Sequence, residues 1–163
     1  MSTGPRQGTA VRKQSMMIAI FLCMLAWAAL AGAHCQVPCG IYDDEGRIQQ
    51  LLEDTTTIAK ATAKIGELAS EHDAQSMNQM IRWVTVKEQH ATHIITTVAE
   101  YFLTQKVKPV AAGSDGYEDY LTSLADHHAV MVAAMKTKQK VDDGAVKTLQ
   151  EAIEKLGTHY HSH

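Results

Sequence analysis

The sequence predicts an all-α protein whose one domain is an antiparallel up-down four-helix bundle. Four stretches place apolar residues three and four positions apart, which is the spacing of one helix face. No stretch rich in β-branched residues alternates apolar and polar positions as a half-buried strand does, and no internal repeat is present. The chain has 163 residues, a length that suits one compact domain with a short appendage. Short connections between four such helices favour up-down-up-down order.

The first 33 residues have the composition of a secretory signal peptide. Three basic residues and no acidic one precede the uncharged stretch 16–31, and Ala-Gly-Ala follows at 31–33. This pattern is typical of a signal that is removed, so we expect cleavage between Ala33 and His34 and export of the mature chain. Its destination, periplasmic, lumenal or secreted, stays open. The alternative is a retained membrane anchor, although the apolar stretch is shorter than the ~20 residues of a bilayer span.

The predicted mature chain, residues 34–163, is acidic. It has twelve Lys and Arg against eighteen Asp and Glu, which gives a formal net charge of −6. That balance argues against a nucleic-acid partner, whose binding surface would be basic, and no block of basic residues is present. After processing we expect no membrane segment. Two of the three cysteines remain, Cys35 and Cys39.

The helices can be placed from the apolar stripes and the breakers between them. Asp43 and Asp44 are suitable N-terminal caps for the first helix. Pro and Gly residues in 106–116 end the second, and Val-Asp-Asp-Gly at 141–144 separates the last two. The core should be mostly Leu, Ile, Val and Ala, with methionines 77, 80, 131 and 135 filling gaps. The stripes predict helices over about 44–71, from Met80 to Phe102, from Tyr117 to Met135 and from Val146 to Tyr160.

The predicted mature terminus concentrates metal donors. Cleavage before His34 gives a free α-amine beside an imidazole, and the thiol of Cys35 follows at once. Cys39 returns a second thiol after a turn that Pro38 helps to set, and Gly40 lets the backbone leave without a side-chain clash. Two soft sulfurs and several nitrogens suit zinc, copper or nickel, and a planar nitrogen-rich arrangement favours Ni(II) or Cu(II). We therefore expect a four-helix bundle with an N-terminal metal-binding hook, an expectation that competes with two other interpretations of the same residues.

Two other interpretations use the same residues. In an exported protein, Cys35 and Cys39 could form a disulfide that closes a purely structural bundle. A disulfide leaves the histidine and the amine at the cleavage point without a role, whereas a metal site uses all of these groups. An exported nickel or copper carrier would use the same donors without turnover. Spacing alone leaves these alternatives open.

The nine residues from His34 to Tyr42 resemble a known metal-binding motif. They read His-Cys-Gln-Val-Pro-Cys-Gly-Ile-Tyr and agree at every fixed position with the His-Cys-x-x-Pro-Cys-Gly-x-Tyr hook of nickel-containing superoxide dismutases. The resemblance spans most of the mature chain, because three further segments are similar to that family: Arg47-Ile48, Lys87-Glu88-Gln89 and Tyr101-Phe102.

The resemblance implies a homohexamer of four-helix bundles with one nickel ion in each hook, residues 34–42. It implies as ligands the α-amine and imidazole of His34, the amide nitrogen and thiolate of Cys35, and the thiolate of Cys39. Pro38 and Gly40 would shape the hook, and Tyr42 would be the catalytic residue in the pocket where the anion approaches. The implied reaction is disproportionation of superoxide to dioxygen and hydrogen peroxide through a Ni(II)/Ni(III) cycle.

The chain departs from the family pattern at two places around the hook. Some members carry a carboxylate on the first helix that orients the ligand imidazole, where this chain has Gln49 and Gln50. The arginine that follows Lys-Glu-Gln in some members is His90 here. A net charge of −6 repels superoxide at long range, so its attraction has to be local. The candidates are Arg47, Lys87, Lys106 and Lys108.

Overall fold

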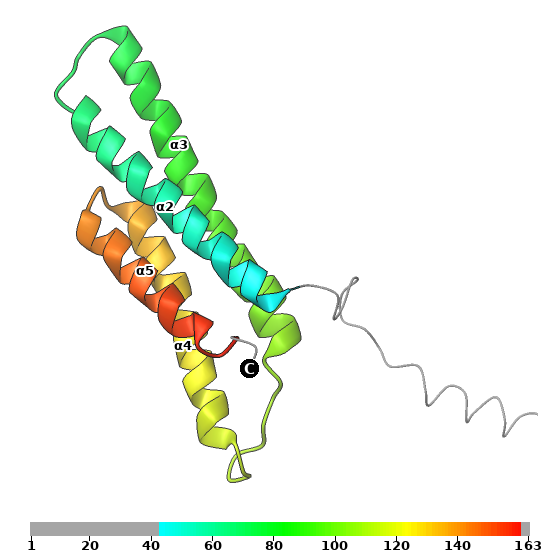
Figure 1. Ribbon diagram of the computed structural model, residues 1–163. Coiled ribbons are helices and arrows are strands. Elements are labelled where there is room, and N and C mark those ends of the chain that lie inside the picture. The colour runs from blue at the N-terminus through cyan, green and yellow to red at the C-terminus, as the bar shows by residue number, and fades with distance from the viewer. Residues whose placement is uncertain (1–42, 161–163) are drawn as a thin grey trace, which may run out of the picture. The chain divides into compact units, whose positions relative to one another are not determined.

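The computed structural model describes residues 43–160, which form a bundle of antiparallel helices (Figure 1). Within this range each helix packs against two others, and no strand is present. One helix, α3, continues directly into a π-helical segment, η1. The predicted all-α four-helix bundle is thus confirmed, whereas the predicted hook lies outside the described residues. The elements in chain order are α2 (Asp44–Leu68), α3 (Ala74–Thr96), η1 (Thr97–Lys106), α4 (Tyr117–Gln139) and α5 (Asp143–Gly157).

The helix starts follow from local capping. Asp43, Asp73 and Asp142 each accept hydrogen bonds from backbone N–H groups in the first turn of α2, α3 and α5, which satisfies donors that a helix leaves unpaired. The predicted cap at Asp43 is confirmed. α3 begins at Ala74, earlier than its apolar stripe indicates, because Asp73 caps it there. α4 follows Gly116, whose φ of 81° lies in the left-handed region that glycine tolerates.

The core is aliphatic with one large aromatic side chain. Phe102 from η1 is fully buried and packs against the ring of Tyr160. The aliphatic composition of the rest of the core agrees with the prediction. The methionine prediction is partly wrong, because Met77 and Met135 are exposed, while Met131 packs against the core. The buried cluster comprises Ile48, Leu51, Ile58, Ala91, Ile94, Val98, Phe102, Val130, Ala133, Ala134, Val146, Leu149, Ile153 and Leu156.

The two helical hairpins differ in length and are staggered. α2 has 25 residues and α5 has 15, and the α2–α3 hairpin extends past the turn between α4 and α5 (Figure 1). The first half of α3 consequently exposes an apolar stripe formed by Met77, Ile81 and Val84, of which Ile81 is 64% exposed. None of the described helices is long and apolar enough to cross a bilayer.

A buried lysine joins α3 to the end of α4. The side chain of Lys87 is 3% exposed, and its Nζ donates to the carbonyls of Thr137, Lys138 and Lys140 at 2.5, 2.9 and 3.3 Å. These carbonyls have no helical partner at the end of α4, and a cation there suits the helix dipole. Lys87, a residue of α3, therefore caps the C-terminal end of α4.

We expect replacement of Lys87 by methionine to destabilise the bundle, because the three carbonyls lose a charged donor while the aliphatic stem is kept. Hydrogen bonds to charged groups contribute about 1.5–3 kcal/mol, so the free energy of unfolding should fall by about that amount. Urea denaturation followed by circular dichroism measures the change.

The matched control is Lys64→Met. Lys64 pairs with Glu67 on the surface and its side chain is 42% exposed, and exposed pairs contribute about 1 kcal/mol or less. Equal loss of stability in the two variants would contradict the capping role of Lys87.

Candidate functional site

The predicted hook residues lie outside the described residues, so their placement stays a prediction. This applies to the ligands His34, Cys35 and Cys39 and to Tyr42. The described chain begins at Asp43, directly after the hook, and enters α2 at once. The groups around the start of α2 are therefore the nearest described surroundings of the hook in the chain.

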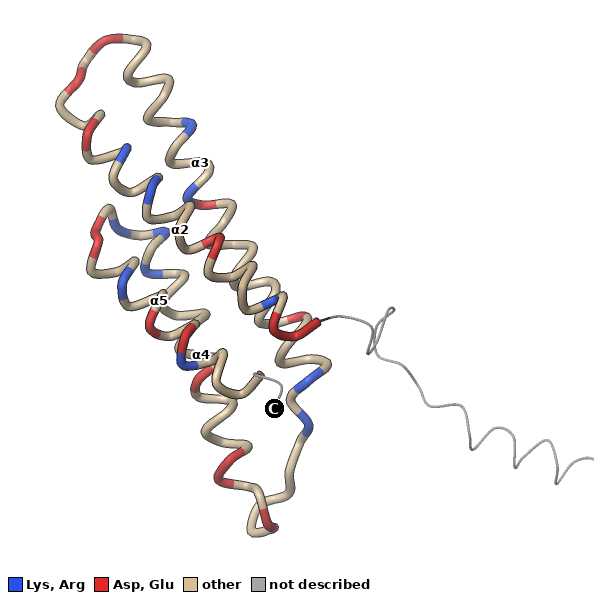
Figure 2. The backbone as a smooth tube through the Cα atoms, viewed as in Figure 1, with Lys and Arg blue, Asp and Glu red and all other residues tan. Residues whose placement is uncertain are grey.

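Asp44 ties the start of α2 to the segment η1. The hydroxyl of Tyr101 donates to one carboxylate oxygen of Asp44, and Nζ of Lys106 lies 2.7 Å from the other. Burial raises the pKa of Tyr101, and the bond to Asp44 raises it further, so the phenol keeps its proton at neutral pH. Figure 2 shows acidic and basic residues together at this end of the bundle.

Arg47 lies over the same phenol. Its Cζ is 5.6 Å from the centre of the Tyr101 ring, a cation–π distance, and its Nη1 donates to Oε1 of Gln50 at 3.0 Å. One of the two glutamines that replace the family's carboxylate therefore has a partner on its own helix. The other, Gln49, is exposed.

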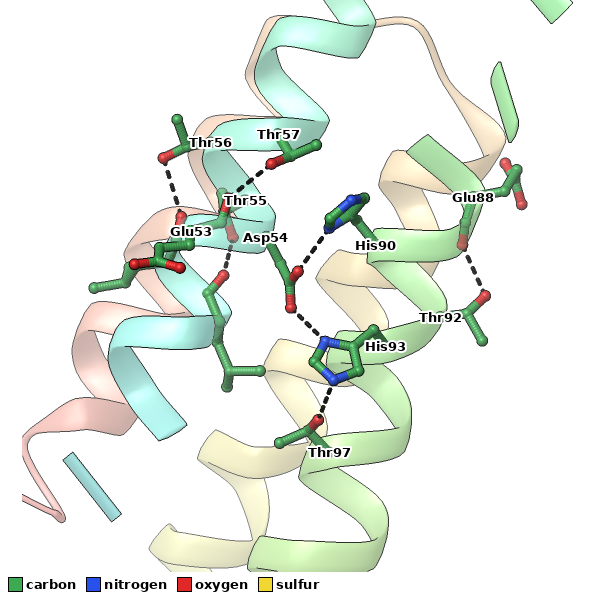
Figure 3. Close-up of polar contacts among 12 residues, drawn as sticks. Glu53, Asp54, Thr55, Thr56, Thr57, Glu88, His90, Thr92, His93 and Thr97 are labelled. Carbon is green, nitrogen blue, oxygen red and sulfur yellow. Dashed lines mark hydrogen bonds and ion pairs between the residues drawn. The ribbon is translucent and has the colours of Figure 1, made fainter. Parts of the chain in front are cut away.

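A buried carboxylate on α2 binds two histidines of α3 (Figure 3). Asp54 is 6% exposed, and its two oxygens lie 2.7 Å from Nδ1 of His90 and 2.6 Å from Nδ1 of His93. Because an ionised carboxylate only accepts, each ring must carry its proton on Nδ1. The histidine that stands where some family members have arginine is thus held by this carboxylate.

A second buried carboxylate fixes the end of α5 on α4. Asp126 accepts from Nζ of Lys155 at 2.6 Å and binds Nε2 of His159 at 2.9 Å. Burial alone would raise the pKa of Asp126, but the bonds from Lys155 and His159 outweigh it and lower the pKa. The carboxylate is therefore ionised at neutral pH.

His127, the next residue, is fully buried and makes two hydrogen bonds. Its Nδ1 lies 2.7 Å from the carbonyl oxygen of Ser123, and its Nε2 lies 2.7 Å from the hydroxyl of Tyr160. Burial lowers the pKa of His127, and this outweighs the opposing bond to Ser123. The imidazole is therefore neutral at physiological pH.

The cations expected to attract superoxide have different surroundings. The expectation for Lys87 is wrong, because its ammonium is enclosed by the carbonyls of α4. Lys106 and Lys108 line an open pocket of about 320 Å³ together with Tyr120, His159 and other residues. Lys106 is paired with Asp44, and Nζ of Lys108 donates to the carbonyl of Gln105. Both remain at the end of the bundle where α2 begins.

Sequence reasoning missed the two buried carboxylates. Asp54 lies three residues after Leu51 and four before Ile58, and Asp126 lies four before Val130. Both positions fall on the apolar stripe of their helix, and an acid in that register is the signal that a buried partner exists. Within residues 43–160, no three His, Cys, Asp or Glu side chains are grouped so that they could hold a metal ion.

The four-helix bundle and the histidine and cysteines just before it in the sequence are typical of one class, a four-helix-bundle metalloprotein. A family model described as nickel-containing superoxide dismutase matches residues 29–163, which include the whole hook and the whole bundle. The chain belongs to this family, and it is accordingly a nickel-containing superoxide dismutase, an oxidoreductase that acts on superoxide. No curated protein and no solved structure matches the chain.

The lowered pKa of His127 predicts a pH dependence of stability. The unfolded chain binds this proton near its ordinary pKa of 6.5, whereas the folded chain binds it only at lower pH. The stabilising effect is therefore full above about pH 6.5 and declines as the pH falls toward the folded pKa. We expect the urea midpoint to fall between about pH 7 and about pH 5.5, and to fall less in His127→Gln.

The exposed neighbour provides the control for this comparison. His128→Gln should keep the pH profile of the unmodified protein, because His128 is exposed. Parallel pH profiles for His127→Gln and the unmodified protein would show that the buried imidazole does not set the dependence.

Proposed function

We propose that residues 34–42 hold one nickel ion per subunit. The ligands are the α-amine and imidazole of His34, the amide nitrogen and thiolate of Cys35, and the thiolate of Cys39. The observation that carries this proposal is the family match over a chain segment in which every fixed hook position is intact. The donor set fits the ion, because soft thiolates combined with several nitrogen donors suit nickel.

The ligands also account for the redox chemistry. Bound nickel supplies the one-electron couple between Ni(II) and Ni(III) that superoxide disproportionation requires. Cys35 and Cys39 place negative charge at the site, which favours the higher oxidation state. Pro38 and Gly40 set the turn between the two thiolates. Tyr42 positions the incoming anion through its hydroxyl, since an ordinary pKa of about 10 makes the phenol a weak acid.

Removal of residues 1–33 would create one of the ligands. In the precursor, the nitrogen of His34 is part of the peptide bond with Ala33, and its lone pair is delocalised into the carbonyl. A free α-amine has a pKa of about 8 and gives up its proton to a metal. Cleavage at Ala33/His34 therefore accompanies export, and the mature protein is 34–163 with its nickel bound outside the cytoplasm, in a periplasmic, lumenal or secreted location.

Local positive charge would guide superoxide to the site. The mature chain has a formal net charge of −6, which repels an anion at a distance. Arg47, Lys106 and Lys108 remain candidates because they lie on or near the start of α2 and the end of η1. The charge of Lys106 is largely offset by Asp44, so Lys108 carries more of the attraction than Lys106.

The exposed apolar stripe supports association of subunits. Met77, Ile81 and Val84 lie on one face of α3, where an exposed apolar surface is costly in water. A subunit contact would cover them. The number six, for a homohexamer, comes from the family resemblance, and the stripe supports only that subunits meet.

The thiolates are expected to be necessary for turnover. Cys35→Ser and Cys39→Ser should each abolish superoxide disproportionation, because a hydroxyl does not replace the anionic charge of a thiolate. Pulse-radiolysis decay of superoxide measures turnover, and circular dichroism should show the same helix content as in the unmodified protein. Cys23→Ser is the matched control, since Cys23 belongs to the predicted signal peptide and should be absent from the mature enzyme.

Normal turnover in either hook variant would contradict the ligand assignment. A disulfide between Cys35 and Cys39 in the active protein would contradict it as well.

The mass of the native complex tests the remaining proposals together. We expect six subunits, each beginning at His34 and each with one nickel ion, in native mass spectrometry of protein purified from its source. A subunit that retains residues 1–33 would refute processing, and a nickel count below the subunit count would refute the stoichiometry. A different subunit number would refute the hexamer alone.

A further inference from the structure

Four aromatic rings form a continuous column at the end of the bundle where α2 begins. The ring of Tyr101 lies 5.0 Å from that of Phe102, and Phe102 lies 4.5 Å from Tyr160 and 5.9 Å from His127. These centroid distances are those of packed aromatic pairs. One end of the column is bonded to Asp44 through Tyr101, and Asp44 follows Tyr42 by two residues. We call these four residues the aromatic column.

The tautomer of His127 makes it a base for Tyr160. The carbonyl of Ser123 can only accept, so Nδ1 of His127 must donate to it. The other ring nitrogen, Nε2, then has a free lone pair, and the hydroxyl of Tyr160 donates to it at 2.7 Å. Burial keeps this imidazole neutral by lowering its pKa. The phenol thus has a neutral acceptor within the distance required for proton transfer.

Tyr160 is held in place although it lies beyond the end of α5. Its backbone N–H donates to Gly157, and the preceding residue, His159, is bonded to Asp126 on α4. Asp126 also binds Lys155 one turn earlier. These bonds hold the phenol against Phe102 and His127, and they keep the hydrogen bond between Tyr160 and His127 in place.

We propose that Tyr160 and His127 form a proton-coupled one-electron donor. One electron leaves the ring of Tyr160 for a one-electron oxidant, the phenolic O–H bond breaks, and the proton moves to Nε2 of His127. The oxidant is reduced by one electron, and the products are a neutral phenoxyl radical and an imidazolium ion. Superoxide can return the electron and become dioxygen, while Nε2 returns the proton to the phenolate oxygen.

The column gives this donor a use in the protein. Oxidised nickel at the proposed site would be a one-electron oxidant. The inference rests on the proposed function only for this source of the oxidant. Thiolates such as those of Cys35 and Cys39 are themselves readily oxidised. A phenol that yields an electron through packed rings would draw an oxidising equivalent away from them. Tyr101 and Phe102 supply the packed rings between the start of α2 and Tyr160.

The test uses an external oxidant so that nickel turnover does not enter the result. The mature protein is mixed with a ruthenium tris-bipyridine photosensitiser and an electron acceptor and is flashed with visible light. We expect the EPR signal of a neutral phenoxyl radical. The signal should be lost in Tyr160→Phe, which keeps the ring packing, and retained in Tyr117→Phe. Tyr117 is the control because its ring lies against Tyr120 and, within residues 43–160, against no imidazole.

A second variant tests the proton acceptor. His127→Gln can still accept a hydrogen bond from Tyr160 but cannot take its proton, so the radical signal should be lost although the tyrosine is present. Circular dichroism reports whether this variant folds, and the Tyr160→Phe comparison stands if it does not. A radical of unchanged intensity in either variant, or no phenoxyl radical in the unmodified protein, would overturn the proposal.

The outcome is separable from that of the nickel proposal. Loss of superoxide turnover in the hook variants bears on the ligands, while the flash experiment bears on Tyr160 and His127 alone. A positive radical test with an inactive hook, or the reverse, would therefore show which of the two proposals fails.

Discussion

Burial of one apolar stripe on each helix is the constraint on which the rest of the structure depends, because a charged group on a stripe is costly unless it finds a partner inside the bundle. Asp54, Lys87, Asp126 and His127 are such groups, and each is almost fully buried. Each meets a partner from another part of the chain, so the four contacts fix which turn of one helix faces which neighbouring segment. Apolar packing alone is less directional, and the polar contacts therefore specify the register.

The same constraint explains the end of the bundle where α2 begins. η1 has the wider turn of a π-helix. This form is rare in proteins, and where it does occur it is often at a functional site. Two adjacent residues of this segment act differently, since Tyr101 bonds to Asp44 and Phe102 enters the core. The hydrogen bond from Tyr101 thus links the start of α2 to a segment whose next residue, Phe102, is buried in the core. Any movement of Asp44 is opposed by the packing of Phe102.

Much of the fold was predictable from the sequence, because helical periodicity and Asp or Gly at helix ends act locally. The helix over about 44–71 and the break after 106 are examples, and both are close to what the structure shows. The π-helical form of 97–106 was not predictable, since no local residue pattern demands it. The role of Lys87 was also missed, because its carbonyl partners lie about fifty residues away in the chain and a lysine on a helix is usually solvated.

The candidate site was likewise predictable from the sequence only in part. The donor set of the hook is continuous in sequence, so His34, Cys35 and Cys39 could be proposed as ligands from nine residues and a predicted cleavage point. That assignment stays a prediction. Sequence reasoning missed the buried carboxylates Asp54 and Asp126, although both lie in the apolar register, and that register does not say which histidines they bind. Those pairs depend on how α2 faces α3 and how α4 faces α5. Only the assembled bundle supplies that information.

The core that the described residues form among themselves has a thermodynamic consequence. Among the described residues, the buried cluster is drawn from residues 48–156, and Asp54, Lys87, Asp126 and His127 also find partners within 43–160. Metal binding contributes to folding where the metal nucleates the core, and here the core has its own apolar and polar partners. Nickel would then order the hook rather than the helices. Under the proposed export and processing, the bundle would fold first, and cleavage before His34 would then create the ligand amine.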